Sequence, residues 1–323
     1  MKMAVMPSTS LRSSVSKSQL KVSVLAGGIG EEREVSIQSG ECICQALNKK
    51  DVNATLSDIA PGNLAALDED GTDVFFPALH GKFGEDGELQ TIMEKRNLIY
   101  TGSGPKASRL AFDKMAGKAR FKNANVKVPR ALLFNPDLSL KEFKKQIKWK
   151  SDRFVVKPIR QGSSVGVSIV SGLDEAFTTA AATYRQFGNC MIEEHIPGRE
   201  VTVGILCNDA LPIIEIRPRE TFYNYHSKYI DDQTDYLFDT ITDASLAVAI
   251  QQDALHCFNA LGCRDFARVD FILGDNGEAY ALEINTIPGF TSHSLLPKAA
   301  AKAGFSMGQL CVKIIESAVE RKR

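Results

Sequence analysis

The sequence predicts an α/β protein, in which an open parallel α/β domain comes first and an α+β part with antiparallel strands follows. Between residues 21 and 96, short apolar strands alternate with amphipathic helices, which is typical of a parallel sheet with helices on both faces. After residue 190, the links between successive strands are too short to hold a crossover helix, and this indicates antiparallel pairing.

The first part of the chain is expected to be a tail and an N-terminal domain. Residues 1–20 contain six serines and three basic residues but no acidic one, which predicts a disordered tail, although a transit peptide has a similar composition. Residues 21–105 form the N-terminal α/β domain, which ends near the Gly/Pro/Ser-rich stretch 101–108. Its expected elements are strands at 21–28, 52–58 and 73–80 and helices at 32–50 and 88–96.

Two further subdomains are expected, at 106–200 and 201–323. The elements expected in the central one are two short helices, a strand at 131–134, a helix that begins after Ser139 with Glu142 as a capping box, a strand at 153–158, a helix at 173–187 and a strand at 190–196. The C-terminal one is expected to contain strands at 200–207 and 211–218, a helix at 244–262, a hairpin at 265–285 and two closing helices. The polar, aperiodic stretch 218–243 predicts a long functional loop, a candidate lid.

The composition is that of a folded protein with small-molecule partners. Of 323 residues, 44% are apolar and 24% are charged, which excludes a collagen-like or broadly disordered chain. Basic and acidic residues number 39 each, and no apolar run approaches the length of a membrane span, so we expect no nucleic acid and no membrane as partners. The seven cysteines form no C-x-x-C pair, which indicates reduced thiols and a cytoplasmic location.

A glycine cluster follows the first strand. Gly28 and Gly30 begin a dinucleotide-binding fingerprint, but the position that requires its last glycine holds Arg33, so an NAD-dependent oxidoreductase is not favoured. The cluster is either an anion site at a helix N-terminus or a simple tight turn.

Two more glycine-rich loops are candidate ligand sites. His80 lies at the end of a buried strand in LHGKFGEDGELQ, where open α/β sheets bind ligands, although a flexible loop would also fit. Lys157 precedes the loop QGSSVG, a combination that suits phosphate binding through backbone N–H groups and a fixed cation. The loop lacks the Walker G-K-[ST] junction, and the alternative is a plain hairpin turn.

The predicted hairpin RVDFILGDNGEAYALEIN carries the strongest signal. Arg268 and Asp270 share one face of a strand, Glu283 and Asn285 share one face of the next, and the tight turn brings these faces together. Two carboxylates and an amide oxygen on one face predict a site for Mg²⁺ held between protein and phosphates. The opposite face is expected to be apolar, with Phe271, Leu273, Tyr280 and Leu282.

Nine segments together resemble D-alanine:D-alanine ligases of the ATP-grasp superfamily, in the family's order and spacing over residues 21 to about 320. These are GGIGEEREVS, LHGKFGEDG, YTGSG, DKMAGK, VVKPIRQGSSVG, IEEHIPGREVTV, FYNYHSKY, ARVDFIL and LEINTIPGFTSHSLLP. The resemblance implies an open parallel α/β N-terminal domain followed by a two-subdomain ATP-grasp fold that holds ATP between two antiparallel sheets.

The resemblance also implies a role for each matching residue. Residues implied in catalysis are Glu32, Ser163, Tyr229 and Arg268. Those implied in substrate binding are His80, Gly289, Ser294 and Leu295. Those implied in ATP binding are Lys114, Lys157, Glu193, Ile196, Glu200 and Lys228. Those implied to bind two Mg²⁺ or Mn²⁺ ions are Asp270, Glu283 and Asn285.

The activity that the resemblance implies is ADP-forming ligation of two D-alanines through an acyl phosphate, for peptidoglycan synthesis, by a homodimer. A competing interpretation is a nucleotide-binding regulator that kept the fold and lost the chemistry. The chain departs from the family pattern at Ile159, Gln161, His226 and Ser227, and it has no proline after Tyr236. None of these departures removes an implied ligand.

Overall fold

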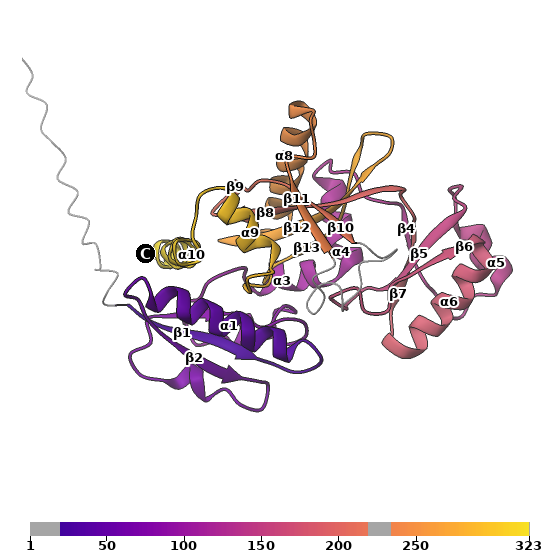
Figure 1. Cartoon of the computed structure of the whole chain (residues 1–323). Coiled ribbons are helices and arrows are strands. Elements are labelled where there is room, and N and C mark those ends of the chain that lie inside the picture. The colour runs from indigo at the N-terminus through magenta and orange to yellow at the C-terminus, as the bar shows by residue number, and fades with distance from the viewer. Residues whose placement is uncertain (1–19, 219–233, 323) are drawn as a thin grey trace, which may run out of the picture.

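The structure is a computed structural model that describes residues 20–218 and 234–322. Its strands form three sheets, with the N-terminal sheet at the lower left of Figure 1, the largest sheet in the middle and the third at the right. The predicted tail lies outside the described residues except for Leu20, and so does most of the predicted loop 218–243.

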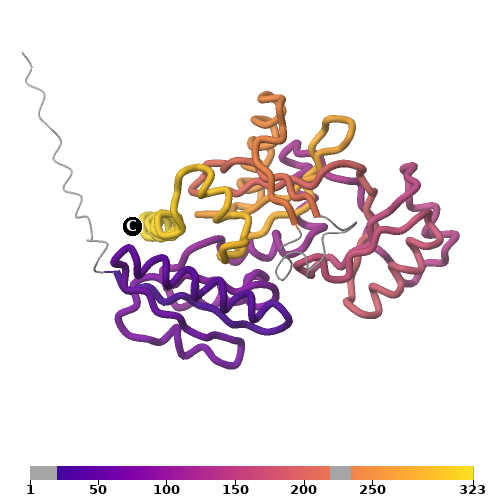
Figure 2. Tube along the Cα trace, viewed as in Figure 1, coloured from indigo at the N-terminus to yellow at the C-terminus, as the bar shows by residue number. Residues whose placement is uncertain are grey.

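The N-terminal sheet is parallel, with strand order β2-β1-β3, as predicted. Its elements are β1 (Lys21–Gly27), α1 (Arg33–Asn48), β2 (Asn53–Ile59), the 3₁₀ helix η2 (Ala65–Asp68), β3 (Val74–Pro77) and α2 (Glu88–Lys95). Neighbouring residues of β1 point to opposite faces, so Val24 packs with α1 while Leu25 packs with α2. The last helix, α10 (Met307–Lys322), returns to lie beside α1 (Figure 2).

The central sheet is antiparallel, with strand order β4-β7-β5-β6. Its elements are β4 (Ala131–Leu133), α5 (Leu140–Gln146), β5 (Arg153–Pro158), β6 (Ser168–Ser171), α6 (Gly172–Phe187) and β7 (Cys190–Glu194). The predicted capping box is confirmed, because Ser139 and Glu142 exchange side-chain and backbone hydrogen bonds at the start of α5. Helices α5 and α6 cover one face of this sheet through Phe143 and Ala176.

The largest sheet is antiparallel and has the order β11-β10-β8-β12-β13, with β9 paired to β8. Its elements are β8 (Gly198–Leu206), β9 (Asp209–Ala210), β10 (Ile214–Pro218), β11 (Thr234–Phe238), α8 (Ala244–Leu261), β12 (Phe266–Gly274) and β13 (Ala279–Asn285), followed by α9 (Leu295–Lys302). Strand β11 lies within the stretch expected to be a loop. Among the described residues it is a short strand at the edge of the sheet, paired with β10, and such a pairing leaves no periodic signal in the sequence.

Helices α3 (Pro105–Phe112) and α4 (Lys114–Asn123) pack against the largest sheet and α8. Phe121 of α4 is fully buried in the same core as Phe258 and Val269. Helix α4 therefore begins beside the region where the largest sheet faces the central one, and this position brings its lysines into the candidate site.

Candidate active site

The β12–β13 hairpin places its polar residues as predicted. Arg268 pairs with Asn285 and Asp270 pairs with Glu283 in the register of the two strands. The prediction for the opposite face was wrong in part, because a bulge follows Asp270 and shifts the register. As a result, Leu282 lines the polar side together with Glu283, and Tyr280 pairs with Ile272 on that same side.

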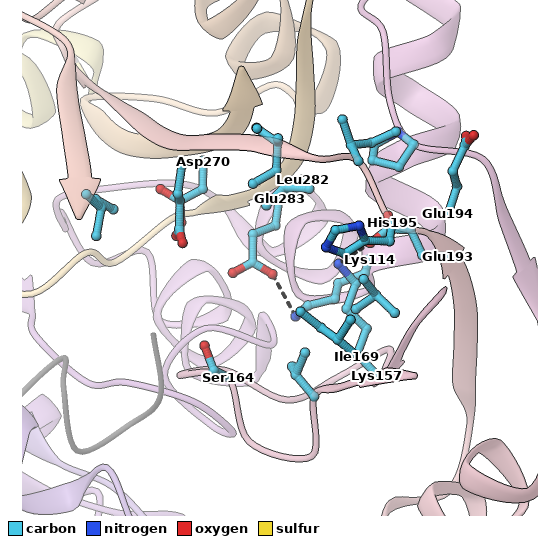
Figure 3. A pocket seen from close by; sticks show the side chains of 18 of the residues that line it. Lys114, Lys157, Ser164, Ile169, Glu193, Glu194, His195, Asp270, Leu282 and Glu283 are labelled. Carbon is cyan, nitrogen blue, oxygen red and sulfur yellow. Dashed lines mark ion pairs between the residues drawn. The ribbon is translucent and has the colours of Figure 1, made fainter. Parts of the chain in front are cut away.

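A cavity of about 510 Å³ lies between the central and the largest sheet (Figure 3). One wall comes from β5 and β7 and the other from β8, β10, β12 and β13. The described residues expected at ATP all line it, namely Lys114, Lys157, Glu193, Ile196 and Glu200. Asp270 and Glu283, expected at the metal, line it as well. The structure thus brings together residues from five of the nine segments that carry the resemblance.

Lys114 bridges two parts of this cavity. Its Nζ lies 2.9 Å from Oε2 of Glu283 and donates a hydrogen bond of 2.7 Å to the backbone carbonyl of Gln161 in the glycine loop. Figure 3 shows the ion pair as a dashed line, with Ser164 of the loop on the side away from β12 and β13. A cation is therefore fixed between the loop and the candidate metal ligands, where a phosphate chain would need one.

Glu193 lies in the other wall and is paired with two lysines. Its Oε2 is 2.7 Å from Lys157 Nζ, and its Oε1 forms an ion pair with Lys118. Burial alone would raise the pKa of Glu193, but the two lysines hold this pKa below its usual value. Burial lowers the pKa of Lys118 to about 8. Lys118 was not predicted from the sequence, although its place one helical turn after Lys114 was an available signal.

A second, smaller cavity of about 50 Å³ adjoins the first and shares Glu200, Asp270 and Glu283 with it. The described residues expected in catalysis or in substrate binding line this cavity. They are Glu32, His80, Ser163, Arg268, Gly289, Ser294 and Leu295, and Asn285 lines it too. The pocket contains side chains from all three parts of the chain, which sequence spacing alone does not bring together.

Glu32 is held between two glycine-containing loops. Ser163 donates a hydrogen bond from Oγ to Oε1 of Glu32, as the resemblance implied. A Cβ added at Gly81 would lie 2.6 Å from Oε2 of Glu32, and one added at Gly162 would lie 3.3 Å from Oε1. The carboxylate therefore occupies space that only glycine leaves open.

His80, which is buried, and Glu85, which is half-buried, line the smaller cavity together with Glu32. Burial lowers the pKa of His80, so this imidazole is neutral near pH 7. The carboxyl of Glu85 has its pKa raised to about 8, first by burial and then by the charge of Glu32. Oε2 of Glu85 accepts a hydrogen bond of 2.7 Å from the Gly81 backbone N–H. Sequence reasoning missed Glu85 although it lies in the quoted loop, because nothing in that loop marks which acidic side chain lines the cavity.

Asp270 accepts hydrogen bonds from three neighbouring side chains. Arg268 donates to it from Nε at 2.9 Å and from Nη2 at 2.8 Å, and Thr202 donates from Oγ1 at 2.6 Å. Asn285 donates from Nδ2 at 3.0 Å. Asp270, Glu283 and Asn285 together provide two carboxylates and one amide oxygen. This oxygen set fits Mg²⁺, which takes its other ligands from phosphates and water.

The remaining predicted site residues, Lys228 and Tyr229, lie outside the described residues. Within the ranges that the structure covers, no helix combines the length and the apolar character needed to cross a membrane. All seven cysteines lie in those ranges and are free thiols, as predicted.

Comparison with known proteins assigns the family. The family model described as "D-ala D-ala ligase C-terminus" matches residues 127–316, and that described as "D-ala D-ala ligase N-terminus" matches residues 60–103. A D-alanine–D-alanine ligase of Syntrophotalea carbinolica is 41% identical over 313 residues, which cover 94% of this chain and 98% of the relative. The chain belongs to the D-alanine–D-alanine ligase family.

Solved structures of this ligase family agree with the assignment. A D-alanine–D-alanine ligase from Bacillus anthracis has a TM-score of 0.81 and 33% identity and covers 94% of this chain and 98% of its own. The same ligase complexed with ATP has a TM-score of 0.80 and 32% identity, with the same coverage. These matches confirm the expected fold, an open parallel α/β domain followed by the two-subdomain ATP-grasp fold.

Proposed function

We propose that this chain is an ADP-forming ligase that joins two D-alanine molecules to D-alanyl-D-alanine with ATP. The observation that carries the proposal is the pair of adjoining cavities that share Asp270 and Glu283. The lining of the larger one suits a nucleotide and that of the smaller one suits the charged groups of amino-acid substrates, so a phosphate can pass from one to the other at the shared carboxylates. The relatives named as D-alanine–D-alanine ligases support the choice of substrate.

ATP lies in the larger cavity in this proposal. Lys114 and Lys157 contact its phosphates, since both ammonium groups line the cavity. Glu193 and Ile196 contact the adenine, and Glu200 contacts the ribose. Lys228 is assigned to the γ-phosphate from the family resemblance alone, since it lies outside the described residues.

Asp270, Glu283 and Asn285 would hold two Mg²⁺ or Mn²⁺ ions. Bound there, the ions offset the negative charge of the phosphates. The donor set supports this assignment because both carboxylates line both cavities. Arg268 and Lys114 neutralise the same carboxylates within the protein.

The chemistry then follows from the placement of the chain's own residues. A carboxylate is inert toward amines in water, so the carboxylate of the first D-alanine attacks the γ-phosphorus of ATP, and ADP leaves. The amine of the second D-alanine attacks the resulting acyl phosphate. Arg268 stabilises the oxyanion that forms before phosphate leaves, since its guanidinium is fixed by Asp270 at the rim of the smaller cavity.

The amino-acid substrates lie in the smaller cavity. Glu32 accepts the ammonium group of the first D-alanine, with His80 as a neighbour, and Gly289, Ser294 and Leu295 contact the second. Tyr229 completes a hydrogen-bonded triad with Glu32 and Ser163 by resemblance. Supply of D-alanyl-D-alanine for peptidoglycan synthesis and assembly as a homodimer also remain predictions.

A coupled assay tests the proposal. The purified chain is incubated with Mg²⁺ and ATP plus D-alanine, L-alanine or D-lactate, and the nucleotide, phosphate and organic products are measured. ADP and phosphate should appear in step with dipeptide and only with D-alanine. AMP and pyrophosphate would contradict the acyl-phosphate route, and an ester as the main product in a D-alanine/D-lactate mixture at pH 7 would contradict the choice of second substrate.

A further inference from the structure

Two lysines of helix α4 contact residues in opposite walls of the larger cavity. Lys114 and Lys118 are four residues apart, so they lie on the same face of the helix. Lys114 reaches Glu283 in the largest sheet, and Lys118 reaches Glu193 in the central sheet. Lys114 lines the cavity, but Lys118 does not. Lys118 is 3% exposed and therefore lies behind Glu193, out of direct reach of a bound nucleotide.

Glu193 is enclosed between two cations. Only 2% of its surface is exposed, and each of its carboxylate oxygens forms an ion pair with a different lysine. Lys157 approaches from the cavity side, where it is expected to bind phosphate. Lys118 approaches from the protein side and is anchored by a further contact of 3.5 Å to the backbone carbonyl of Pro129.

This arrangement matters because Lys157 has two possible partners. If Lys157 turns to a phosphate, Glu193 loses one of its two counter-charges while it stays buried. A buried carboxylate without a cation is costly and would take up a proton instead. Lys118 does not line the cavity where the phosphates would bind, so it remains with Glu193 whatever Lys157 does.

We propose that Lys118 is a positioning residue for nucleotide recognition. It keeps Glu193 ionised and correctly oriented at the base end of the cavity, and it frees Lys157 to bind phosphate. The proposal rests on the proposed function to the extent that the cavity binds ATP.

The proposal has a consequence for the choice of base. An ionised carboxylate accepts a hydrogen bond from the exocyclic amino group of adenine, whereas guanine presents a carbonyl oxygen at that position. Loss of Lys118 should therefore weaken ATP binding more than GTP binding. A lysine that only supports the fold would change both affinities alike.

The test measures binding of ATP and GTP to the full chain by calorimetry, without D-alanine. Lys118→Met should raise the Kd for ATP at least ~10-fold, which corresponds to about 1.4 kcal/mol of binding free energy. The Kd for GTP and the KM for D-alanine should change much less. Lys122→Met is the matched control, since Lys122 lies one turn further along α4, is exposed and should leave both affinities unchanged.

Equal losses for ATP and GTP, or no loss for ATP, would overturn the proposal. If the unmodified chain bound no ATP at all, the proposed function would fail instead, so the two failures are distinguishable.

A second pair of variants remains informative if Lys118→Met does not fold. Glu193→Gln removes the negative charge that Lys118 is proposed to stabilise. The double variant Glu193→Gln/Lys118→Met should therefore differ from Glu193→Gln in ATP affinity by less than ~2-fold, because the two residues act as one unit. If the double variant bound ATP ~10-fold more weakly than Glu193→Gln, the loss expected for Lys118→Met alone, Lys118 would act independently of Glu193 and the proposal would be refuted.

Discussion

Lys114 Nζ lies 2.9 Å from Oε2 of Glu283, and this ion pair joins the first residue of α4 to the third residue from the end of β13. The side chains are 11% and 22% exposed, so each compensates for the burial of the other. In the proposed function, Lys114 belongs to the ATP phosphates and Glu283 to the metal ions. Each residue therefore already has a neutralising partner inside the protein when it meets a ligand of the opposite charge.

Replacement of Glu283 by Gln should abolish turnover and leave the fold intact. In the proposed function Glu283 would be a charged Mg²⁺ ligand, which a neutral amide oxygen cannot replace, so kcat should fall at least ~10²-fold, the scale of losing one electrostatic contact to a transition state. Steady-state kinetics and circular dichroism measure the two effects. Activity within a few-fold of the parent, with an unchanged spectrum, would remove Glu283 from the site.

Arg268→Lys should lower kcat by ~10²-fold or more, because a lysine provides one point charge where Arg268 places two N–H donors on Asp270. The KM for ATP should stay within a few-fold, since the residue acts on the oxyanion. Arg185→Lys is the control, because Arg185 lies on the exposed side of α6, and this variant should leave kcat unchanged. If the two variants had similar kcat values, Arg268 would be no more than a structural partner of Asp270.

Gly81→Ala should impair use of the first D-alanine. The new Cβ would lie 2.6 Å from Oε2 of Glu32 and displace this carboxylate. Gly71→Ala is a matched control, because Gly71 has a similar φ of +79° but no atom within 4 Å of the added Cβ. Both variants should lose about 1 kcal/mol of stability from the left-handed backbone, and only Gly81→Ala should lose kcat/KM for D-alanine. Equal kinetics of the two variants would contradict the role of the clash.

Glu85 should make the protein less stable as pH rises from about 5 to 8. Its carboxyl has a pKa of about 8 in the folded protein against 4.5 in the unfolded chain, so over this range the folded state binds more protons. Stability is greatest below the unfolded pKa and falls until the folded pKa is passed. Glu85→Gln should remove this dependence of stability on pH, which amounts to at most about 5 kcal/mol when the pKa shift is converted to free energy.

Urea unfolding at pH 5, 6, 7 and 8 measures the effect of Glu85. The difference in unfolding free energy between Glu85→Gln and the parent should grow in favour of the variant with pH. A difference that does not change with pH would mean that Glu85 is ionised in the folded protein.

The parts of the candidate site that are formed by residues close in sequence were predictable from the sequence. The β12–β13 hairpin is an example, since strand parity and one tight turn suffice to bring Asp270 and Glu283 together. The parallel N-terminal sheet and the capping box at Ser139 followed in the same way from local periodicity and local hydrogen bonds. The assignment of roles to these residues came from the resemblance to a family.

The bulge after Asp270 and the strand β11 were not predictable from local pattern. A bulge adds one residue to one strand without changing its apolar character, so Leu282 and Tyr280 were placed on the wrong face. Edge strand β11 has its pairing on one side only and therefore few constraints on its sequence.

The sequence by itself determined most of the elements, the family and the hairpin that presents the candidate metal ligands, because these depend on short-range spacing. Tertiary structure alone decided which charged groups are buried and which partner each one meets. Glu193 acquires two lysines from α4 and β5, and Glu85 keeps a proton to about pH 8, because burial and long-range charge depend on elements that pack together from distant parts of the chain.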